Sequence, residues 1–265
     1  MKPRKGIILA GGSGTRLAPM TTAVSKQLLP VYDKPMIYYP LSTLMSCGIN
    51  EILVIVTPRD RKSFELLLGD GSQWGVDIKY AVQEKPEGIA QAFVIAEEFI
   101  AGHPCALILG DNLFHGEHLP TIFQKASKRS DGASLFAYRV QDPFRYGVVT
   151  FDKSKRAVDI EEKPKNPKSP YAVTGLYFYD ASVVKRAKNL QLSERQEYEI
   201  TDLNKSYMRD RKLTVEVLGN GTAWLDTGTP DSLHDAGSYI RTLQNRQGIQ
   251  IGSPQLIAEQ TGWIS

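Results

Sequence analysis

The chain has 265 residues, of which 42% are apolar and 23% charged, proportions typical of a soluble globular protein with a substantial core. The formal net charge is only +3, and the basic residues are scattered among acidic ones, which argues against a nucleic-acid-binding surface. No apolar run approaches the length of a membrane span, and the apolar stretch 7–10 is too short for an export signal. We therefore expect a cytoplasmic protein with no nucleic-acid or membrane partner.

The first half of the chain alternates short apolar runs with amphipathic stretches. We predict strands at 6–10, 51–56, 78–82 and 106–109, and helices at 36–45, 61–68 and 89–99. The strands are rich in Val, Ile and Leu without alternation, as expected of strands buried on both faces. This order predicts an α/β fold of Rossmann-like type, with a mostly parallel central sheet and helices on both faces.

After Gly132 the pattern changes to closely spaced strand-like segments separated by turn residues. We predict strands at 133–138, 146–151, 157–162, 173–179 and 213–217, and helices at 200–209 and 232–244. This spacing indicates a mixed, partly antiparallel region. No linker is long enough to separate domains, so we expect a single domain over residues 1–265. Within it we distinguish a first half over residues 1–131, a second half over residues 132–228 and a C-terminal helical segment over residues 229–265.

A glycine-rich loop follows the first predicted strand and reads Gly11, Gly12, Ser13, Gly14, Thr15, Arg16 and Leu17. Glycines just past the end of a parallel strand let backbone N–H groups surround phosphate oxygens, and Arg16 adds a planar donor fork. The loop matches neither the Walker A pattern nor GxGxxG, because Leu17 takes the place of the third glycine. Lys26 follows ten residues after Arg16 and could reach the same phosphates. A tight-packing turn and an ordinary surface lysine remain alternatives on these residues alone.

Two aspartates follow apolar segments. Asp111 comes after the predicted strand 106–109, and Asp226 ends the short apolar segment 223–226 before a glycine turn. Carboxylates at strand ends suit Mg²⁺, which takes one or two carboxylates together with phosphate oxygens. An aspartate in this position is also a common helix cap or turn former, so each residue alone leaves both interpretations open.

The segments 11–19 and 26–30 together resemble the signature of the sugar nucleotidylyltransferase family. Segment 31–41 resembles the glucose-1-phosphate thymidylyltransferases within that family, and the similarity extends over the chain to about Gly262. The resemblance implies one nucleotidyltransferase domain, in which residues 1–131 bind nucleotide and residues 132–228 bind sugar phosphate. It also implies that dTTP and glucose 1-phosphate are joined, by Mg²⁺-assisted in-line displacement, to give dTDP-glucose and pyrophosphate. This is the first step of dTDP-sugar biosynthesis, for example of dTDP-rhamnose, and the family members are homotetramers.

The resemblance further implies roles for individual residues, with Asp111 and Asp226 as metal ligands. The implied catalytic residues are Arg16, Lys26, Asp111, Lys163 and Asp226. The implied nucleotide contacts are Gly11, Gly12, Ser13, Gly14, Thr15, Arg16, Lys26, Gln27, Gln83, Gly88 and Asp111. The implied sugar-phosphate contacts are Asn112, Tyr146, Gly147, Glu162, Lys163 and Val173. Chemically, the Gln83 amide can donate to and accept from a pyrimidine edge, while Glu162 can bind sugar hydroxyls and Lys163 a phosphate.

Other functions fit the same pattern less well. A transferase that prefers UTP, or that uses another hexose 1-phosphate, would keep the fold and most of the motifs. A non-catalytic nucleotide-sugar-binding regulatory protein should have lost a metal-binding carboxylate or the loop arginine, and both are present. A dinucleotide-dependent dehydrogenase requires a glycine spacing that this loop does not have.

Overall fold

The computed structural model describes residues 2–12 and 14–264. The strands are β1 Lys5–Ala10, β2 Pro30–Val31, β3 Lys34–Pro35, β4 Glu51–Val56, β5 Asp77–Val82, β6 Cys105–Leu109, β7 Asn112–His115, β8 Ala133–Arg139, β9 Gly147–Phe151, β10 Ala157–Glu162, β11 Tyr171–Tyr179, β12 Leu213–Val217 and β13 Ala223–Asp226. The α-helices are α1 Tyr38–Ser46, α2 Arg61–Leu68, α3 Gln91–Ile95, α4 Glu97–Ile100, α5 Leu119–Ser127, α6 Val183–Lys188, α7 Ile200–Arg209, α8 Pro230–Gln247 and α9 Pro254–Thr261. Short 3₁₀ turns are η1 Thr15–Leu17, η2 Lys26–Leu28, η3 Ser72–Trp74 and η4 Pro143–Arg145.

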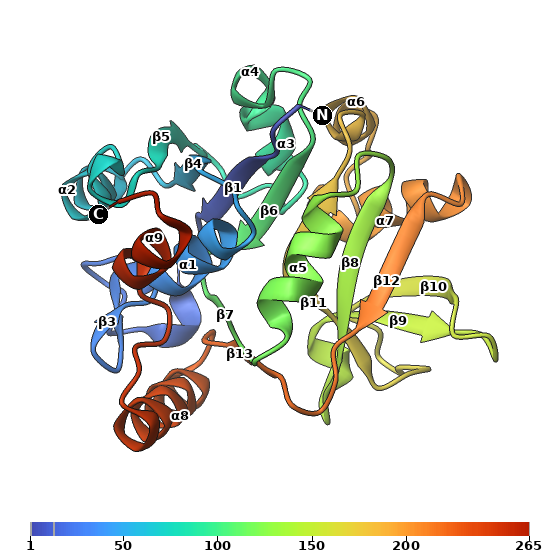
Figure 1. Ribbon diagram of the computed structural model, residues 1–265. Helices are drawn as coiled ribbons and strands as arrows, with labels where there is room; N and C mark the ends of the chain where they lie inside the picture. The colour runs from blue at the N-terminus through green and yellow to red at the C-terminus, as the bar shows by residue number, and fades with distance from the viewer. Residues whose placement is uncertain (1, 13, 265) are drawn as a thin grey trace.

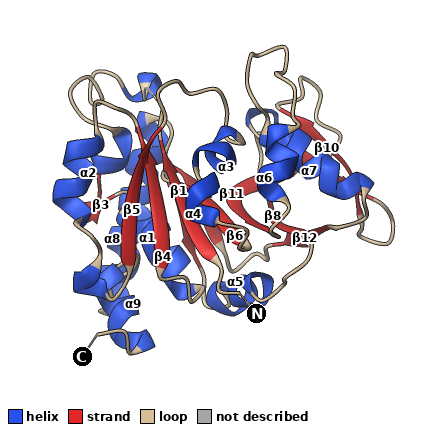
Figure 2. Cartoon of the chain, turned by 90° about the horizontal axis from the view of Figure 1, so that it is seen from above, coloured by secondary structure: helices blue, strands red, loops and turns tan. Residues whose placement is uncertain are grey.

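A central sheet runs through the molecule, as Figures 1 and 2 show, with Figure 1 giving the chain order by colour. Within the described residues the sheet has nine strands: seven in the order β10-β9-β11-β6-β1-β4-β5, with β8 paired to β11 and β12 to β8. The neighbours of β1, and the pair β4–β5, are parallel, whereas β11 is antiparallel to both β6 and β8. The predicted α/β fold, with a parallel core and a mixed second half, is confirmed.

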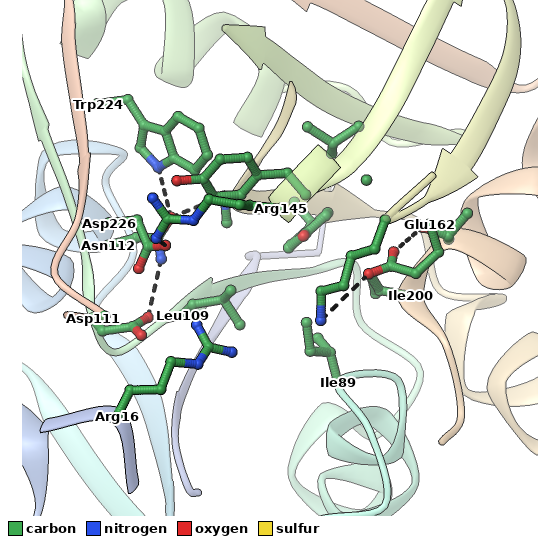
Figure 3. A pocket seen from close by; sticks show the side chains of 18 of the residues that line it. Arg16, Ile89, Leu109, Asp111, Asn112, Arg145, Glu162, Ile200, Trp224 and Asp226 are labelled. Atoms are coloured by element: carbon green, nitrogen blue, oxygen red, sulfur yellow. Dashed lines mark hydrogen bonds and ion pairs between the residues drawn. The ribbon is translucent and has the colours of Figure 1, made fainter. Parts of the chain in front are cut away.

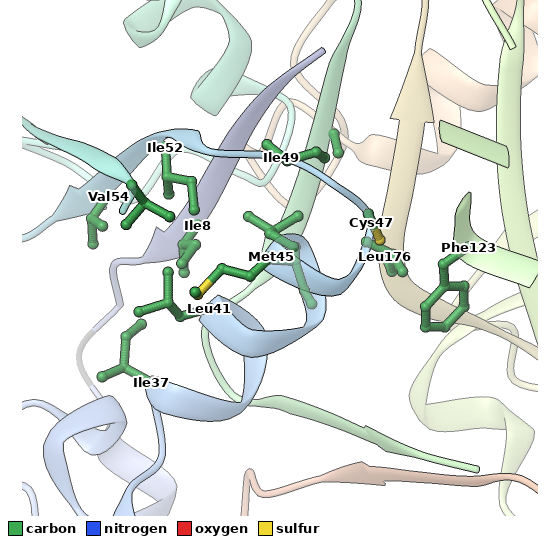
Figure 4. Packing of buried hydrophobic residues seen from close by; sticks show 14 of the residues in the cluster. Ile8, Ile37, Leu41, Met45, Cys47, Ile49, Ile52, Val54, Phe123 and Leu176 are labelled. Atoms are coloured by element: carbon green, nitrogen blue, oxygen red, sulfur yellow. The ribbon is translucent and has the colours of Figure 1, made fainter. Parts of the chain in front are cut away.

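Two apolar layers cover the faces of the sheet. On one face, Leu41 and Met45 of α1 lie over β1 and β4, as Figure 4 shows, together with apolar residues of α2, α5 and α9. On the other face, Phe93 of α3 belongs to a cluster with residues of α4, α6 and α7. Ile7 and Ile8 of β1 belong to opposite layers, and both are fully buried. Burial on both faces is why the parallel strands show no apolar–polar alternation.

The order of the parallel strands opens a crevice next to β1. The chain adds β4 and β5 on one side of β1 and then returns to place β6 on the other side. In open parallel sheets, ligands bind at such a reversal of strand order, beyond the carboxyl ends of the strands. The glycine-rich loop after β1 therefore lies where the topology favours a ligand.

The second half of the chain reaches the same edge of the sheet. β11 is antiparallel to β6, with Leu176 opposite Ile108, so the first residues of β11 lie beside the carboxyl ends of the parallel strands. β9 and β10 form an antiparallel pair in which Glu162 lies opposite Gly147. The mixed topology thus brings residues expected to bind sugar phosphate toward the loop after β1.

Local structure differs from the sequence-based expectation in several places, and α5, α6, β2 and β3 are among the elements that were not predicted. The helix expected over 89–99 is divided into α3 and α4 at Ala96, whose ψ of 7° departs from the helical value of about −42°. The strands β7 and β13 were not predicted, and they pair with each other as a separate antiparallel ribbon. Each has only four residues and a partner far away in the sequence, so neither has a local periodicity that would indicate it.

None of the described helices combines the length and the apolar character that a membrane crossing requires.

Arg4 ties the segment before β1 to the ends of neighbouring elements. Its guanidinium donates to the carbonyl oxygens of Cys105 and Tyr179, each at 2.7 Å, and to that of Ser127 at 2.9 Å. A fourth hydrogen bond goes to the carbonyl oxygen of Arg129. One side chain therefore satisfies acceptors from β6, β11 and the end of α5, none of which is its sequence neighbour.

Arg4→Met should lower the free energy of unfolding by about 2–4 kcal/mol, because it leaves partly buried carbonyl oxygens without a charged donor. Urea unfolding with an unchanged m-value would measure this loss. Arg61→Met is the matched control, since Arg61 forms an exposed ion pair with Glu65 and should change stability by no more than about 0.5 kcal/mol. Equal losses for the two variants would contradict the role given to Arg4.

Candidate active site

The loop after β1 has backbone geometry suited to surrounding a phosphate. Gly12 and Gly14 have φ values of 103° and 61°, in the region that favours glycine. The carbonyl oxygen of Gly14 accepts a hydrogen bond from Thr21 Oγ1 at 2.8 Å, which holds the turn closed. Arg16 follows on η1, and its exposed side chain lines a cavity that Asp111 and Asp226 also line. Ser13, also expected to contact nucleotide, lies outside the described residues.

Asp111 and Asp226 are brought together by the ribbon of β7 and β13. In its antiparallel register Asp226 lies opposite Asn112, the residue that follows Asp111. Thr227 reinforces the junction, because both its backbone N, at 3.3 Å, and its Oγ1, at 2.8 Å, donate to the carbonyl oxygen of Asp111. Figure 3 shows the two carboxylates on the same wall of the pocket.

The electrostatics of the two carboxylates differ. Burial alone would raise the pKa of Asp111, but the charge of Lys26, with hydrogen bonds from Lys26 and Asn112, outweighs burial and lowers it. Burial raises the pKa of Asp226, and the negative charge of Asp111 raises it further. Arg145 Nη2 lies 3.9 Å from Asp226 Oδ2 and offsets some of this effect. A cation placed between the two carboxylates would stabilise both in their ionised form.

Asn112 connects Asp111 to the wall of the pocket. Its Nδ2 donates to Asp111 Oδ1 at 3.0 Å. Its Oδ1 accepts from Trp224 Nε1 at 2.6 Å and from Gly175 N at 3.1 Å. Figure 3 shows Asp111 and Trp224 beside Asn112. A Cβ at position 175 would lie 2.5 Å from Asn112 Oδ1, so only glycine fits there. The amide of Asn112 therefore orients Asp111 and Trp224, and its expected contact with the sugar phosphate stays a prediction.

Glu162 and Lys163 lie at the other side of the pocket, at the end of β10. Glu162 Oε2 accepts from Thr201 Oγ1 at 2.6 Å, while Glu162 Oε1 lies 3.5 Å from Arg195 Nη1 and 3.9 Å from Lys163 Nζ. Lys163 has a φ of 41°, and its backbone N donates to the carbonyl oxygen of Tyr146 at 3.0 Å. Two cations therefore flank one carboxylate, an arrangement that can bind both sugar hydroxyls and a phosphate.

The residues expected to contact the base lie further along the crevice. Gln83 follows β5, is only 5% exposed, and places its Oε1 against Gly11. Gly88 has a φ of 108°, and a Cβ there would lie 2.5 Å from the carbonyl oxygen of Tyr198. Gln27, expected to contact the nucleotide, is 1% exposed, and its Oε1 accepts a hydrogen bond from Ser25 Oγ at 2.6 Å. These residues lie outside the lining of the cavity around Asp111 and Asp226, and their nucleotide contacts stay predictions.

One cavity of about 310 Å³ is lined by residues of the glycine-rich loop after β1, by the pair Asp111 and Asp226, and by residues around Glu162. The expected residues that line it are Gly14, Thr15, Arg16, Lys26, Asp111, Asn112, Tyr146, Gly147, Glu162, Lys163, Val173 and Asp226. Several other residues of the lining were not expected from the sequence, among them Arg145, Tyr177, Thr201 and Trp224. Trp224 lies within the segment 223–226 and Arg145 directly precedes Tyr146, so both were missed because their neighbours carried the signal. Thr201 lies on α7, where nothing in the local sequence points toward β10.

Comparisons with known proteins identify the family of this chain. A family model described as nucleotidyl transferase matches residues 5–242. The chain belongs to the nucleotidyl transferase family. A glucose-1-phosphate thymidylyltransferase from Xanthomonas campestris pv. campestris (strain B100) is 57% identical over 264 residues, which covers 100% of this chain and 90% of the relative. A relative of the same name from Neisseria meningitidis serogroup A is 58% identical over 261 residues, covering 98% and 91%.

A solved structure from Bacillus anthracis, named for glucose-1-phosphate thymidylyltransferase and determined with sucrose, has a TM-score of 0.83 and 41% identity to this chain. The match covers 90% of this chain and 95% of that one. These findings confirm the family expected from segments 11–19 and 26–30. The span matched by the nucleotidyl transferase model includes the phosphate loop, Lys26 and both carboxylates.

Asp226→Asn should lower kcat for nucleotidyl transfer by about a hundredfold or more, the usual loss when one transition-state stabiliser is removed. Because Asp111 raises the pKa of Asp226, a neutral amide there removes a charge repulsion, and Tm in the absence of metal should not fall. Measuring kcat and Tm on the same preparation separates the two effects. A purely structural Asp226 would instead give a lower Tm with kcat within about a factor of three.

Proposed function

We propose that this protein joins dTTP and α-D-glucose 1-phosphate to form dTDP-glucose and pyrophosphate. The observation that carries the proposal is the half-buried pair Asp111 and Asp226, which lines one cavity with Arg16, Lys26 and Lys163. Polyphosphate and sugar phosphate would both meet cations there. The relatives of that name, 57% and 58% identical over almost the whole chain, support the choice of these two substrates. The product would enter dTDP-sugar biosynthesis.

The proposed reaction is a single in-line displacement at the α-phosphorus of dTTP. A phosphate oxygen of glucose 1-phosphate forms the new bond to phosphorus, and the bond from that phosphorus to the bridging oxygen of the β-phosphate breaks. Pyrophosphate leaves with the electron pair of the broken bond. The nucleophile is already an anion, so no side chain has to remove a proton. Catalysis then depends on positioning and charge neutralisation.

The residues around Asp111 and Asp226 fit Mg²⁺. This ion commonly takes one or two carboxylates and completes its coordination with water and substrate phosphates. Within residues 2–12 and 14–264, no group of three or more His, Cys, Asp or Glu side chains could hold a metal by itself. Two converging carboxylates would therefore bind the ion together with the nucleotide. When bound there, Mg²⁺ would neutralise some of the negative charge on the phosphates.

The side chains of the pocket have separate tasks in this proposal. Arg16 and the glycine loop hold the departing pyrophosphate through planar and backbone donors. Lys26, already paired with Asp111, neutralises the phosphates at the reacting centre. Lys163, next to Glu162 in the lining of the cavity, holds the phosphate of the sugar in line with the α-phosphorus.

A related function, transfer from UTP or to another hexose 1-phosphate, would use the same residues. The 5-methyl group of thymine adds only an apolar contact of roughly 1 kcal/mol. UTP should therefore be used less well than dTTP, but within about one to two orders of magnitude.

The homotetramer that the resemblance implies stays a prediction, and light scattering at micromolar concentration tests it.

The proposed function predicts pyrophosphate release when dTTP, glucose 1-phosphate and Mg²⁺ are all present. Omitting glucose 1-phosphate should abolish release, and excess EDTA should abolish it until Mg²⁺ is restored, because the carboxylate pair and the polyphosphate repel each other. A coupled pyrophosphate assay with dTTP, UTP and several hexose 1-phosphates measures which nucleotide and which sugar phosphate the protein prefers. Full activity in excess EDTA would disprove the metal assignment, and strong preference for another sugar phosphate would disprove the acceptor.

Lys163→Ala should act on the sugar side of the reaction. The Michaelis constant for glucose 1-phosphate should rise by about tenfold or more, the cost of one charged hydrogen bond, while that for dTTP changes little. Lys165→Ala is the matched control, since Lys165 is exposed two residues away and does not line the cavity. If Lys163→Ala raises both Michaelis constants equally, Lys163 provides general charge balance and does not bind the sugar phosphate.

A further inference from the structure

Three hydrogen bonds link Gln83, Glu87 and Gln91 at the edge of the proposed base site. Gln83 Nε2 donates to Gln91 Oε1 at 2.6 Å, and the backbone N of Glu87 donates to the same oxygen at 3.2 Å. Gln91 Nε2 in turn donates to Glu87 Oε2 at 2.8 Å. We call these three residues the glutamine relay. Gln91 is the first residue of α3, so the relay joins the end of β5 to the start of a helix.

The relay determines which way both amide groups face. A backbone N–H can only donate, so the atom of Gln91 that meets the backbone N of Glu87 has to be its oxygen. The other atom of that amide meets a carboxylate, which accepts, and therefore has to be the NH₂ group. Because the Gln91 oxygen faces Gln83, Gln83 has to present its own NH₂ group to it. The Gln83 oxygen is thereby turned away from the relay.

Gln83 Oε1 lies against Gly11, the first residue after β1, so close that any side chain at position 11 would displace it. No described residue donates a hydrogen bond to this oxygen. The side chain starts from a fixed point, because the backbone N of Gln83 donates to the carbonyl oxygen of Val56 at 2.8 Å. A positioned hydrogen-bond acceptor therefore stands beside the phosphate loop.

We infer that Gln91 is a positioning residue that sets the pyrimidine specificity of this enzyme. The inference rests on the proposed function, in which Gln83 contacts the base of dTTP. Thymine and uracil carry a donor at ring N3, which suits the Gln83 oxygen, whereas cytosine carries a lone pair there. A glutamine free to rotate its amide could present NH₂ to cytosine equally well. The relay removes that choice, and so discriminates against cytosine without touching the base.

Gln91→Leu tests the inference, because leucine has a similar size and cannot hold the Gln83 amide. The ratio of kcat/KM for dCTP to that for dTTP should rise by about tenfold or more, the factor expected when one oriented hydrogen bond is lost. The Michaelis constant for dTTP should rise, while that for glucose 1-phosphate stays within about a factor of two. Gln124→Leu is the matched control, since Gln124 is also a helical glutamine, and its amide donates to a backbone carbonyl oxygen far from the pocket.

A charge exchange within the relay provides a rescue that a merely structural role would not give. Gln91→Glu alone sets a carboxylate against the carboxylate of Glu87, and should weaken dTTP use and discrimination. Adding Glu87→Gln supplies an NH₂ group to that position and restores every donor–acceptor pair, so the double variant should regain the wild-type ratio within about threefold. Glu87→Gln alone keeps an acceptor oxygen at position 87 and should change little.

The outcomes separate this inference from the proposed function. If the wild-type protein does not use dTTP, the proposed function fails. If it prefers dTTP to dCTP, and a folded Gln91→Leu variant keeps the same preference, only the inference fails. Loss of activity toward all nucleotides, with a raised Michaelis constant for glucose 1-phosphate and no rescue in the double variant, would show Gln91 to be structural and would also overturn the inference.

Discussion

The pairing of β7 with β13 is the interaction on which the rest of the site depends. It places Asp226, from near the end of the sheet-forming region, beside Asp111, and so creates a half-buried centre with two like charges. Burial raises the pKa of Asp226 and the negative charge of Asp111 raises it further, whereas the charge of Lys26 lowers the pKa of Asp111. One carboxylate at this position would leave the folded state more stable than two, because two repel each other. The residual negative charge is instead suited to a divalent cation that arrives with a polyphosphate.

The mixed topology of the sheet would bring the two proposed anionic substrates to one edge. The parallel strands around β1 open the crevice for the nucleotide, because the strand order reverses there. A further parallel strand would need a long crossover, whereas the antiparallel β11 begins at the edge where β6 ends. The pair β9 and β10 then carries Glu162 and Lys163 to that edge. Both halves of the chain thus line one cavity, with Asp111 and Asp226 on one wall and Glu162 and Ile200 on the other, as Figure 3 shows.

Two amides have comparable tasks, Asn112 in the lining of this cavity and Gln91 beside the proposed base site. The oxygen of Asn112 is fixed by the N–H groups of Gly175 and Trp224, which leaves its nitrogen to orient Asp111. The oxygen of Gln91 is fixed by the backbone N–H of Glu87, which determines how Gln83 faces. In both cases a group that can only donate decides the orientation of an amide. The carboxylates and lysines of the site carry its charge, whereas the amides orient the neighbouring side chains.

By itself, the sequence determined the parallel core, the phosphate loop and the family. These features have local signals: buried strands without alternation, glycines directly after β1, and motifs whose residues lie close together. Asp111 and Asp226 were recognisable as candidates because each ends an apolar segment, but the ribbon that joins them has no local periodicity. The tertiary structure alone decided that Thr201 and Arg195 meet Glu162, that Asn112 supports Asp111, and that Gln91 orients Gln83. Such contacts depend on which elements pack together, and a side chain's hydrogen-bond partners cannot be known until its neighbours from other elements are in place.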